Sequence, residues 1–150
     1  MKATKKAIKI LQKIFDEFGP YGCHIEFTEN KELFSFLFQV SDSGEQTKEL
    51  ITGFFSELNG DTLYDPVIEL NAIVVDGKIE SVDILTWRSN ISILGYVEIE
   101  NNKVFREGKD TGEKVNMNKL LLDFLIQAEQ RCFKMNLPKK IENYAEDDMC

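Results

Sequence analysis

Three short turn sequences between residues 54 and 106 constrain the fold of this chain more than any other feature. Asn59-Gly60-Asp61, Asp76-Gly77 and Asn101-Asn102 separate runs in which apolar and polar residues alternate with a period of two. Such pairs favour the tight turns that join antiparallel strands. The sequence therefore predicts a meander of antiparallel strands over this region.

Helical periodicity predicts one helix before this meander and one after it. Thr4 can cap a first helix that ends at Gly19-Pro20. The apolar residues between Met117 and Cys132 form the stripe of a last helix, which Pro138 ends. The first helix is amphipathic and carries a row of lysines on its polar face.

Residues between the first helix and the meander are typical of a hairpin, with strands over Cys23–Thr28 and Leu33–Val40. A chain of 150 residues has the length of one ordinary domain. We therefore expect a single α+β domain over residues 1–138, in which the two helices pack an antiparallel sheet of about five to seven strands. The polar segment 139–150 contains Glu146-Asp147-Asp148 and few apolar residues, which predicts a disordered tail.

The segment 45–58 fits two structures. Ser43 and Gln46 form a capping box, and the apolar residues of 50–58 fall on one helical face, which favours a helix. Thr52-Gly53-Phe54-Phe55 also suits a strand. Periodicity alone predicts the helix, and the strand remains the alternative.

The register of the Asp76-Gly77 hairpin decides which side chains share a face. A strict two-residue loop mixes polar and apolar residues on both faces, whereas a three-residue loop over 75–77 separates them. That register predicts a core face of Ile68, Leu70, Ala72, Val82 and Ile84. It also places Glu69 directly across from Asp83 on the outer face, and Trp87 on the same outer face, beside Arg88.

Like charges across a strand pair destabilise a sheet unless something compensates for them. Solvent screening, a basic partner surface and a divalent cation would each compensate for Glu69 and Asp83. Tyr96 and Glu98 fall on the outer face of the following hairpin. Asp61 and Asp65 flank a turn, where their side chains can bind nearby backbone donors.

The charge of the chain is unevenly distributed. Its net charge is −8, but the first 13 residues hold five lysines and no acid, so the remainder carries a net charge of −13. This charge repels a phosphate backbone and disfavours direct binding of nucleic acid. It fits either a solvated surface or a surface complementary to a basic protein.

Other function classes lack their sequence signals. The chain has one histidine, His24, and no glycine-rich phosphate loop, zinc pattern or calcium loop, so we expect no catalytic residues, metal or cofactor. Cys23, Cys132 and Cys150 are typical of free thiols. No apolar run is long enough to cross a membrane, and Met1 to Lys13 do not resemble a secretion signal, so we expect a cytoplasmic protein that does not bind membranes.

The block from Phe54-Phe55 to Asp61, followed by Asp65-Pro66-Val67-Ile68-Glu69-Leu70, resembles an uncharacterised domain family of phages, plasmids and conjugative elements. Weaker similarity continues at His24-Ile25-Glu26, at Gly95-Tyr96-Val97-Glu98 and in the last helix. The chain differs from this family in having Val67-Ile68, where the family tends to have an acidic residue and a methionine. It also has an added lysine-rich first helix. The resemblance implies a curved antiparallel sheet in which residues 51–58 form a strand. It also implies a mobile-element origin and no known enzymatic activity.

These observations predict a protein that acts by binding rather than by catalysis. We expect an accessory protein of a mobile element that inhibits a basic host protein, such as a nuclease of a defence system. Its binding surface would contain Asp61, Asp65, Glu69, Asp83, Trp87, Arg88, Tyr96 and Glu98. One alternative is a metal-dependent hydrolase that uses Asp61, Asp65, Glu69 and Asp83. Another is a subunit whose role is to oligomerise, since the oligomeric state remains open.

Overall fold

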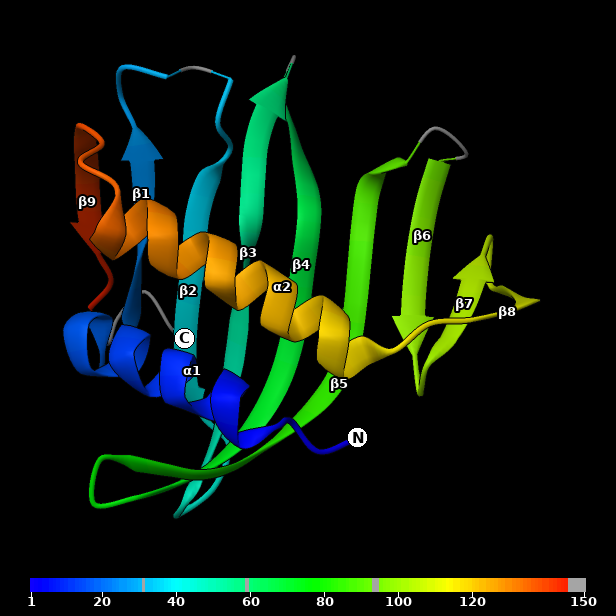
Figure 1. Cartoon of the computed structure of the whole chain (residues 1–150), viewed down its shortest axis with the longest axis horizontal. Helices are drawn as coiled ribbons and strands as arrows, with labels where there is room; N and C mark the ends of the chain where they lie inside the picture. The colour runs from blue at the N-terminus through cyan, green and yellow to red at the C-terminus, as the bar shows by residue number, and fades with distance from the viewer. Residues whose placement is uncertain (31, 59, 93–94, 146–150) are drawn as a thin grey trace.

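The computed structural model describes residues 1–30, 32–58, 60–92 and 95–145. These residues form one antiparallel sheet of nine strands, in the order β8-β7-β6-β5-β4-β3-β2-β1-β9 (Figure 1). The α+β class is confirmed, whereas the expected number of strands is too low. The strands are β1 (Gly22–Phe27), β2 (Ser35–Asp42), β3 (Thr47–Leu58), β4 (Asp61–Val75), β5 (Lys78–Ser92), β6 (Gly95–Glu100), β7 (Lys103–Arg106), β8 (Lys109–Lys114) and β9 (Lys139–Asn143).

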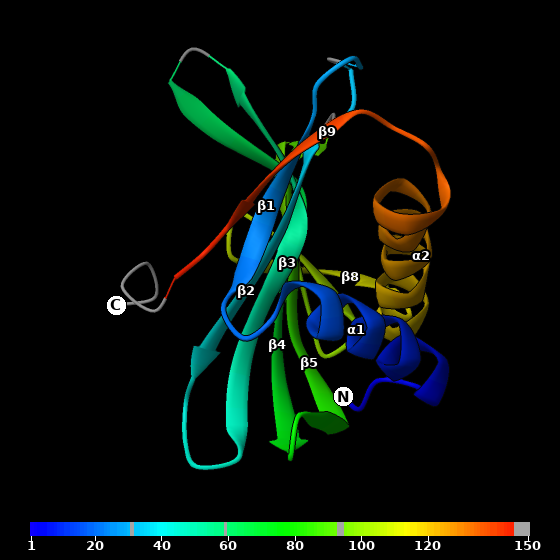
Figure 2. The ribbon, with the colours of Figure 1, turned by 90° about the vertical axis from the view of Figure 1, so that its left-hand side faces the viewer.

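Both helices lie on the same face of this sheet. They are α1 (Lys5–Phe18) and α2 (Met117–Glu129), which a π-helical turn over Gln130–Lys134 continues (Figure 2). The Thr4 hydroxyl caps α1 by accepting a hydrogen bond of 3.3 Å from the amide of Ala7, as the sequence predicts. We call the other side of the sheet, which neither helix covers, the open face.

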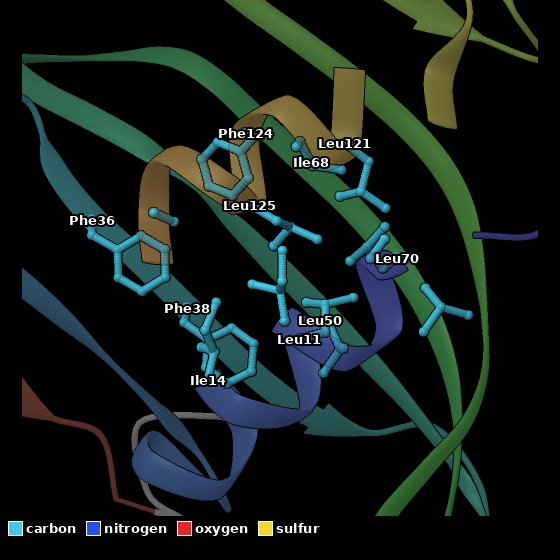
Figure 3. Close-up of a cluster of buried hydrophobic side chains, with 14 of the residues drawn as sticks. Leu11, Ile14, Phe36, Phe38, Leu50, Ile68, Leu70, Leu121, Phe124 and Leu125 are labelled. Carbon is cyan, nitrogen blue, oxygen red and sulfur yellow. The ribbon is translucent and has the colours of Figure 1, made fainter. Parts of the chain in front are cut away.

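The hydrophobic core lies between the helices and the sheet (Figure 3). Helix α1 contributes Leu11 and Ile14, which are fully buried. Every second residue of the central strands packs against these helix residues, because successive side chains of a strand point to opposite faces. Large, fully buried side chains of the strands and of α2 include Phe36, Phe38, Leu50, Ile68, Leu70, Leu121 and Leu125.

Residues 47–58 form strand β3, so the predicted helix over 45–58 is wrong. β3 pairs with β2 on one side and with β4 on the other. Leu50 and Phe54 are buried beneath the helices, whereas Ile51 and Phe55 line the open face. Apolar residues on both faces of the strand therefore imitate the pattern of a helical stripe.

The hairpin of β4 and β5 has a two-residue turn, in which Asp76 and Gly77 have φ angles of 51° and 78°. The predicted three-residue loop is therefore wrong. Two bulges in the ladder, at Ile73/Val74 and at Glu69/Leu70, restore the separation of polar and apolar residues that a strict two-residue register would lose. The five predicted core residues of this hairpin are all buried.

The bulges also change which acidic residues are neighbours. Asp83 is paired with Asn71, and Glu69 is paired with Thr86, so the predicted Glu69–Asp83 pair does not exist. Trp87 is paired with Ile68, whose side chain is fully buried on the helix side. Trp87 therefore packs against the core and does not lie on the outer face.

A further irregularity interrupts the pairing of β3 with β4 between Gly53 and Phe55. Pro66 lies opposite this point and has no amide hydrogen to donate to the ladder. Beyond it, the tip of the hairpin leans away from the helices, toward the open face (Figure 2). A bulge bends the strand that contains it, so this irregularity helps to hollow the open face.

Strands at the two edges of the sheet were not predicted. Lys139–Asn143, expected to be disordered, form β9, which pairs with β1; the rest of that expectation, for residues 146–150, lies outside the described residues. The predicted hairpin across Asn101-Asn102 is confirmed, since Glu100 is paired with Lys103. The segment through Gly108 and Gly112, which was expected to be a polar loop, forms β8, which pairs with β7 across a tight Glu107-Gly108 turn. The exposed polar side chains of β8 and β9 give little periodic signal, because apolar periodicity reveals only strands that are buried on one face.

Candidate functional site

Four of the predicted site residues lie together on the open face. Arg88 on β5 forms an ion pair with Glu69 on β4. The Arg88 guanidinium also donates a hydrogen bond to the hydroxyl of Tyr96, and the negative charge of Glu98 attracts it. Burial works to lower the pKa of Arg88, but Glu69, Tyr96 and Glu98 together outweigh it and raise its pKa above the usual value.

Asp83 lies apart from this group. Its carboxylate is 3.1 Å from Lys2 Nζ and 3.9 Å from the amino terminus. Residues at the start of the chain pair with β5 here, where Ala3 donates a hydrogen bond of 2.8 Å to the carbonyl of Val82. The charge of Asp83 is therefore compensated within the chain.

The other predicted residues are also separated. Asp65 accepts a hydrogen bond of 2.8 Å from Ser89 Oγ, and it borders a hollow beside Trp87 and α2, on the helix side. Asp61 is exposed where β4 begins, at the tip of the hairpin. Within the described part of the chain, no group of three or more histidine, cysteine or acidic side chains could hold a metal ion. The four carboxylates of the alternative, a metal-dependent hydrolase, are thus not brought together among the described residues.

A groove with a volume of about 670 Å³ crosses the open face. Its sides come from β1 to β6 and from Tyr144, which follows β9. Among the described residues, its lining consists of the apolar and aromatic side chains Leu37, Ile51, Phe55, Tyr64, Val67, Tyr96 and Tyr144, together with the polar side chains His24, Gln39, Glu57, Thr62, Arg88 and Asn90. Apolar walls with a few converging polar groups are typical of binding sites.

Four rings form a continuous row along this groove, which we call the aromatic row: Tyr144, His24, Phe55 and Tyr64. The ring of His24 lies 5.6 Å from that of Tyr144 and 6.3 Å from that of Phe55, between centroids. Phe55 and Tyr64 are 6.4 Å apart. His24 also contacts a side chain of β9, since its Nε2 atom is 2.9 Å from a carboxylate oxygen of Glu142.

Several carboxylates of the open face are exposed and are not engaged in ion pairs with the described residues. Strand register places Glu26, Glu49 and Glu57 on this face, where all three are exposed. No ion pair involves them in the part of the chain that the structure describes. Helix α1, in which Lys5, Lys6, Lys9 and Lys13 are exposed, lies on the opposite side of the sheet (Figure 2). These three carboxylates and the exposed lysines of α1 therefore lie on different sides of the sheet.

Sequence reasoning found the group around Arg88 but missed the aromatic row. His24, Phe55, Tyr64 and Tyr144 come from segments far apart in the chain, and Tyr144 belongs to the segment that was expected to be disordered. The sequence offers one signal for His24: in β1 it alternates with the apolar residues Cys23, Ile25 and Phe27, which would place it opposite the core face. The grouping itself follows from strand order, which no single segment encodes.

Comparison of the chain with protein-family models, with curated proteins and with solved structures gave no match. Among the described residues, neither helix has the length and the apolar composition that crossing a membrane requires.

Proposed function

We propose that this chain is a non-enzymatic binding protein that docks on a basic protein through the open face of its sheet. The observation that carries this proposal is the groove on that face, where aromatic rings adjoin exposed carboxylates. Interface centres are enriched in aromatic residues, and complementary charge speeds and orients association. We take the partner to be a host enzyme that handles nucleic acid, because such enzymes present cationic grooves.

The docking surface differs from the one expected from sequence. Glu69 and Asp83 are neutralised by Arg88 and Lys2, so they contribute little attraction to a partner. Glu26, Glu49 and Glu57 take their place as the charged part of the surface. The resemblance to a domain family of mobile elements supports an inhibitory role, in which the chain occupies the groove that its partner uses for nucleic acid.

Paired charge-reversal variants test this proposal. Glu26→Lys/Glu49→Lys alters the open face, and Glu17→Lys/Asp123→Lys makes the same change in net charge on the helix side, where both residues are exposed. Each immobilised protein is incubated with an extract of the cells that make this chain, and retained proteins are identified by mass spectrometry. We expect the wild type and the helix-side variant to retain the same basic protein, and the open-face variant to lose it.

Inhibition is measured with that retained protein once it is purified. Addition of the wild-type chain should lower its activity on nucleic acid, and the open-face variant should have a weaker effect. Equal retention by both variants, or retention of no protein by the wild type, would show that the proposal is wrong.

A further inference from the structure

We propose that the groove receives an arginine side chain of the partner, which stacks on Phe55 and Tyr64 and pairs with Glu57. This inference rests on the proposed function and names the group that the open face recognises. Three features of the groove lead to it: the aromatic row, the free carboxylate beside it and the internal neutralisation of Arg88.

The aromatic row supplies ring faces for a cation. Phe55 and Tyr64 are half-buried, and their planes are inclined by 50°. Both residues line the groove. A guanidinium above an aromatic ring is attracted by the negative face of the ring, and the attraction grows as water is excluded.

Glu57 supplies the matching negative charge. It follows Phe55 by two residues on β3, so both side chains point to the open face. Register places Glu57 opposite Thr62, and Phe55 opposite Tyr64. An exposed carboxylate thus stands beside two rings at the tip of one hairpin, and no ion pair of the described residues engages it.

Arg88 does not counteract this preference. Its guanidinium is paired with Glu69, so the charge of Arg88 is offset within the groove. The groove therefore has no free cation among its described residues that would recruit an anion. Arginine fits better than lysine, because its planar group can stack on a ring and pair with a carboxylate at the same time.

The chain makes the same kind of contact on its other side. The guanidinium of Arg131 lies 4.5 Å from the ring centroid of Phe54, beneath α2. Phe54 and Phe55 are adjacent in β3, so one ring holds an internal arginine and the next faces the groove. The inferred contact would place a second guanidinium on the open side of the same strand.

Binding of a short peptide to the full-length chain tests the inference. The probe is the blocked pentapeptide acetyl-Gly-Gly-Arg-Gly-Gly-amide, and its counterpart contains citrulline, which keeps the size and the planar shape but has a carbonyl oxygen in place of one nitrogen and therefore lacks the charge. Binding is followed by chemical-shift changes in two-dimensional NMR spectra. We expect the arginine peptide to bind about 10-fold more tightly, and its shifts to centre on His24, Phe55 and Tyr64.

Two variants locate the contact. Glu57→Gln removes the carboxylate charge, and Phe55→Leu removes the ring but keeps an apolar side chain; each should weaken binding of the arginine peptide about 3- to 10-fold. Glu113→Gln on β8 is the control and should bind like the wild type. Equal affinity for arginine and citrulline peptides, or shifts centred elsewhere, would overturn the inference.

The same variants separate this inference from the proposed function. Should Glu57→Gln and Phe55→Leu retain the cellular partner fully while Glu26→Lys/Glu49→Lys loses it, the arginine contact is wrong and the docking face is right. Should the peptide bind as described while the open-face variant still retains the partner, the groove recognises arginine but the proposed function is wrong.

Discussion

Arg88 and Glu69 form an ion pair across strands β5 and β4, in the middle of the face that the helices leave uncovered. Both side chains are about one-third exposed, so solvent screens part of their attraction. The pair nevertheless holds Arg88 in place in the groove and offsets the charge of Glu69 that a partner would otherwise meet.

The first prediction concerns the strength of this pair. Glu69→Gln and Arg88→Met, made singly and together, form a double-mutant cycle for the free energy of unfolding. We expect a coupling energy of about 0.5–1 kcal/mol, because the pair is only half-buried. Urea denaturation followed by circular dichroism measures it. A coupling energy of zero would mean that the two charges are independent in solution.

The second prediction concerns Gly53. A Cβ atom at this position would lie 2.2 Å from the carbonyl oxygen of Pro66, which belongs to the backbone of the neighbouring strand. Gly53→Ala must therefore displace β4 at the irregularity, and we expect it to lower the free energy of unfolding by about 1–3 kcal/mol.

Gly77→Asn is the control for Gly53→Ala. Gly77 has open space around it and a φ of 78°, a conformation that asparagine adopts more readily than most residues. Urea denaturation should show a much smaller loss for Gly77→Asn. Similar losses in the two variants would contradict a steric role for Gly53.

The helices, the first hairpin and the core face of β4 and β5 could be predicted from sequence because each is local. A cap at Thr4, an alternating run such as that of β2 and an Asp-Gly turn all act within a few residues. Bulges could not be predicted in this way, because their positions depend on how two strands from different segments pair. The sequence contained Glu69, Asp83 and Trp87, but the bulges separated Glu69 from Asp83 and turned Trp87 to the helix side.

Strand β9 likewise could not be predicted from its own residues. Lys139–Asn143 contain one apolar residue, Ile141, so no periodicity distinguishes them from a polar tail. Their structure comes from pairing with β1 and from contacts such as the hydrogen bond of 2.9 Å between the Tyr144 amide and the Gly22 carbonyl. A segment of this kind becomes a strand through its partner rather than through its own propensity.

The third prediction therefore concerns the end of the chain. A chain that stops at Pro138 lacks β9 and leaves the hydrogen-bonding groups of β1 unpaired at the sheet edge. We expect lower stability and a tendency to self-associate, because an unpaired edge can join another sheet. Size-exclusion chromatography with light scattering measures the association. A chain that stops at Ala145 keeps β9 and is the control, and identical behaviour of the two chains would contradict a structural role for β9.

The fourth prediction concerns the two buried thiols. Burial raises the pKa of Cys23 to about 12, and Cys132 adds to this effect; burial likewise raises the pKa of Cys132 to about 12. A raised pKa keeps both thiols protonated at neutral pH, and the thiolate is the reactive form. In a Cys150→Ser background, neither thiol should react with a disulfide reagent until the chain unfolds.

That reactivity is measured by the absorbance of the released thiolate, with and without urea. The rate for both cysteines should follow unfolding. In urea it should rise steeply between pH 7 and pH 9, because an exposed thiol has a pKa of about 8.5, whereas without urea it should stay far below the rate in urea at every pH in this range. Rapid reaction of either thiol in the native state would contradict the burial of Cys23 and Cys132.

The docking of the open face on a protein partner is tested most directly by carboxylate footprinting of the captured complex. A carbodiimide and an amine label exposed acids, and mass spectrometry quantifies the label at each residue with and without the partner. We predict that labelling of Glu26, Glu49 and Glu57 falls several-fold in the complex, while labelling of Glu17 and Asp123 on the helix side stays unchanged. Protection of Glu17 and Asp123, with full labelling of the open-face acids, would contradict the account.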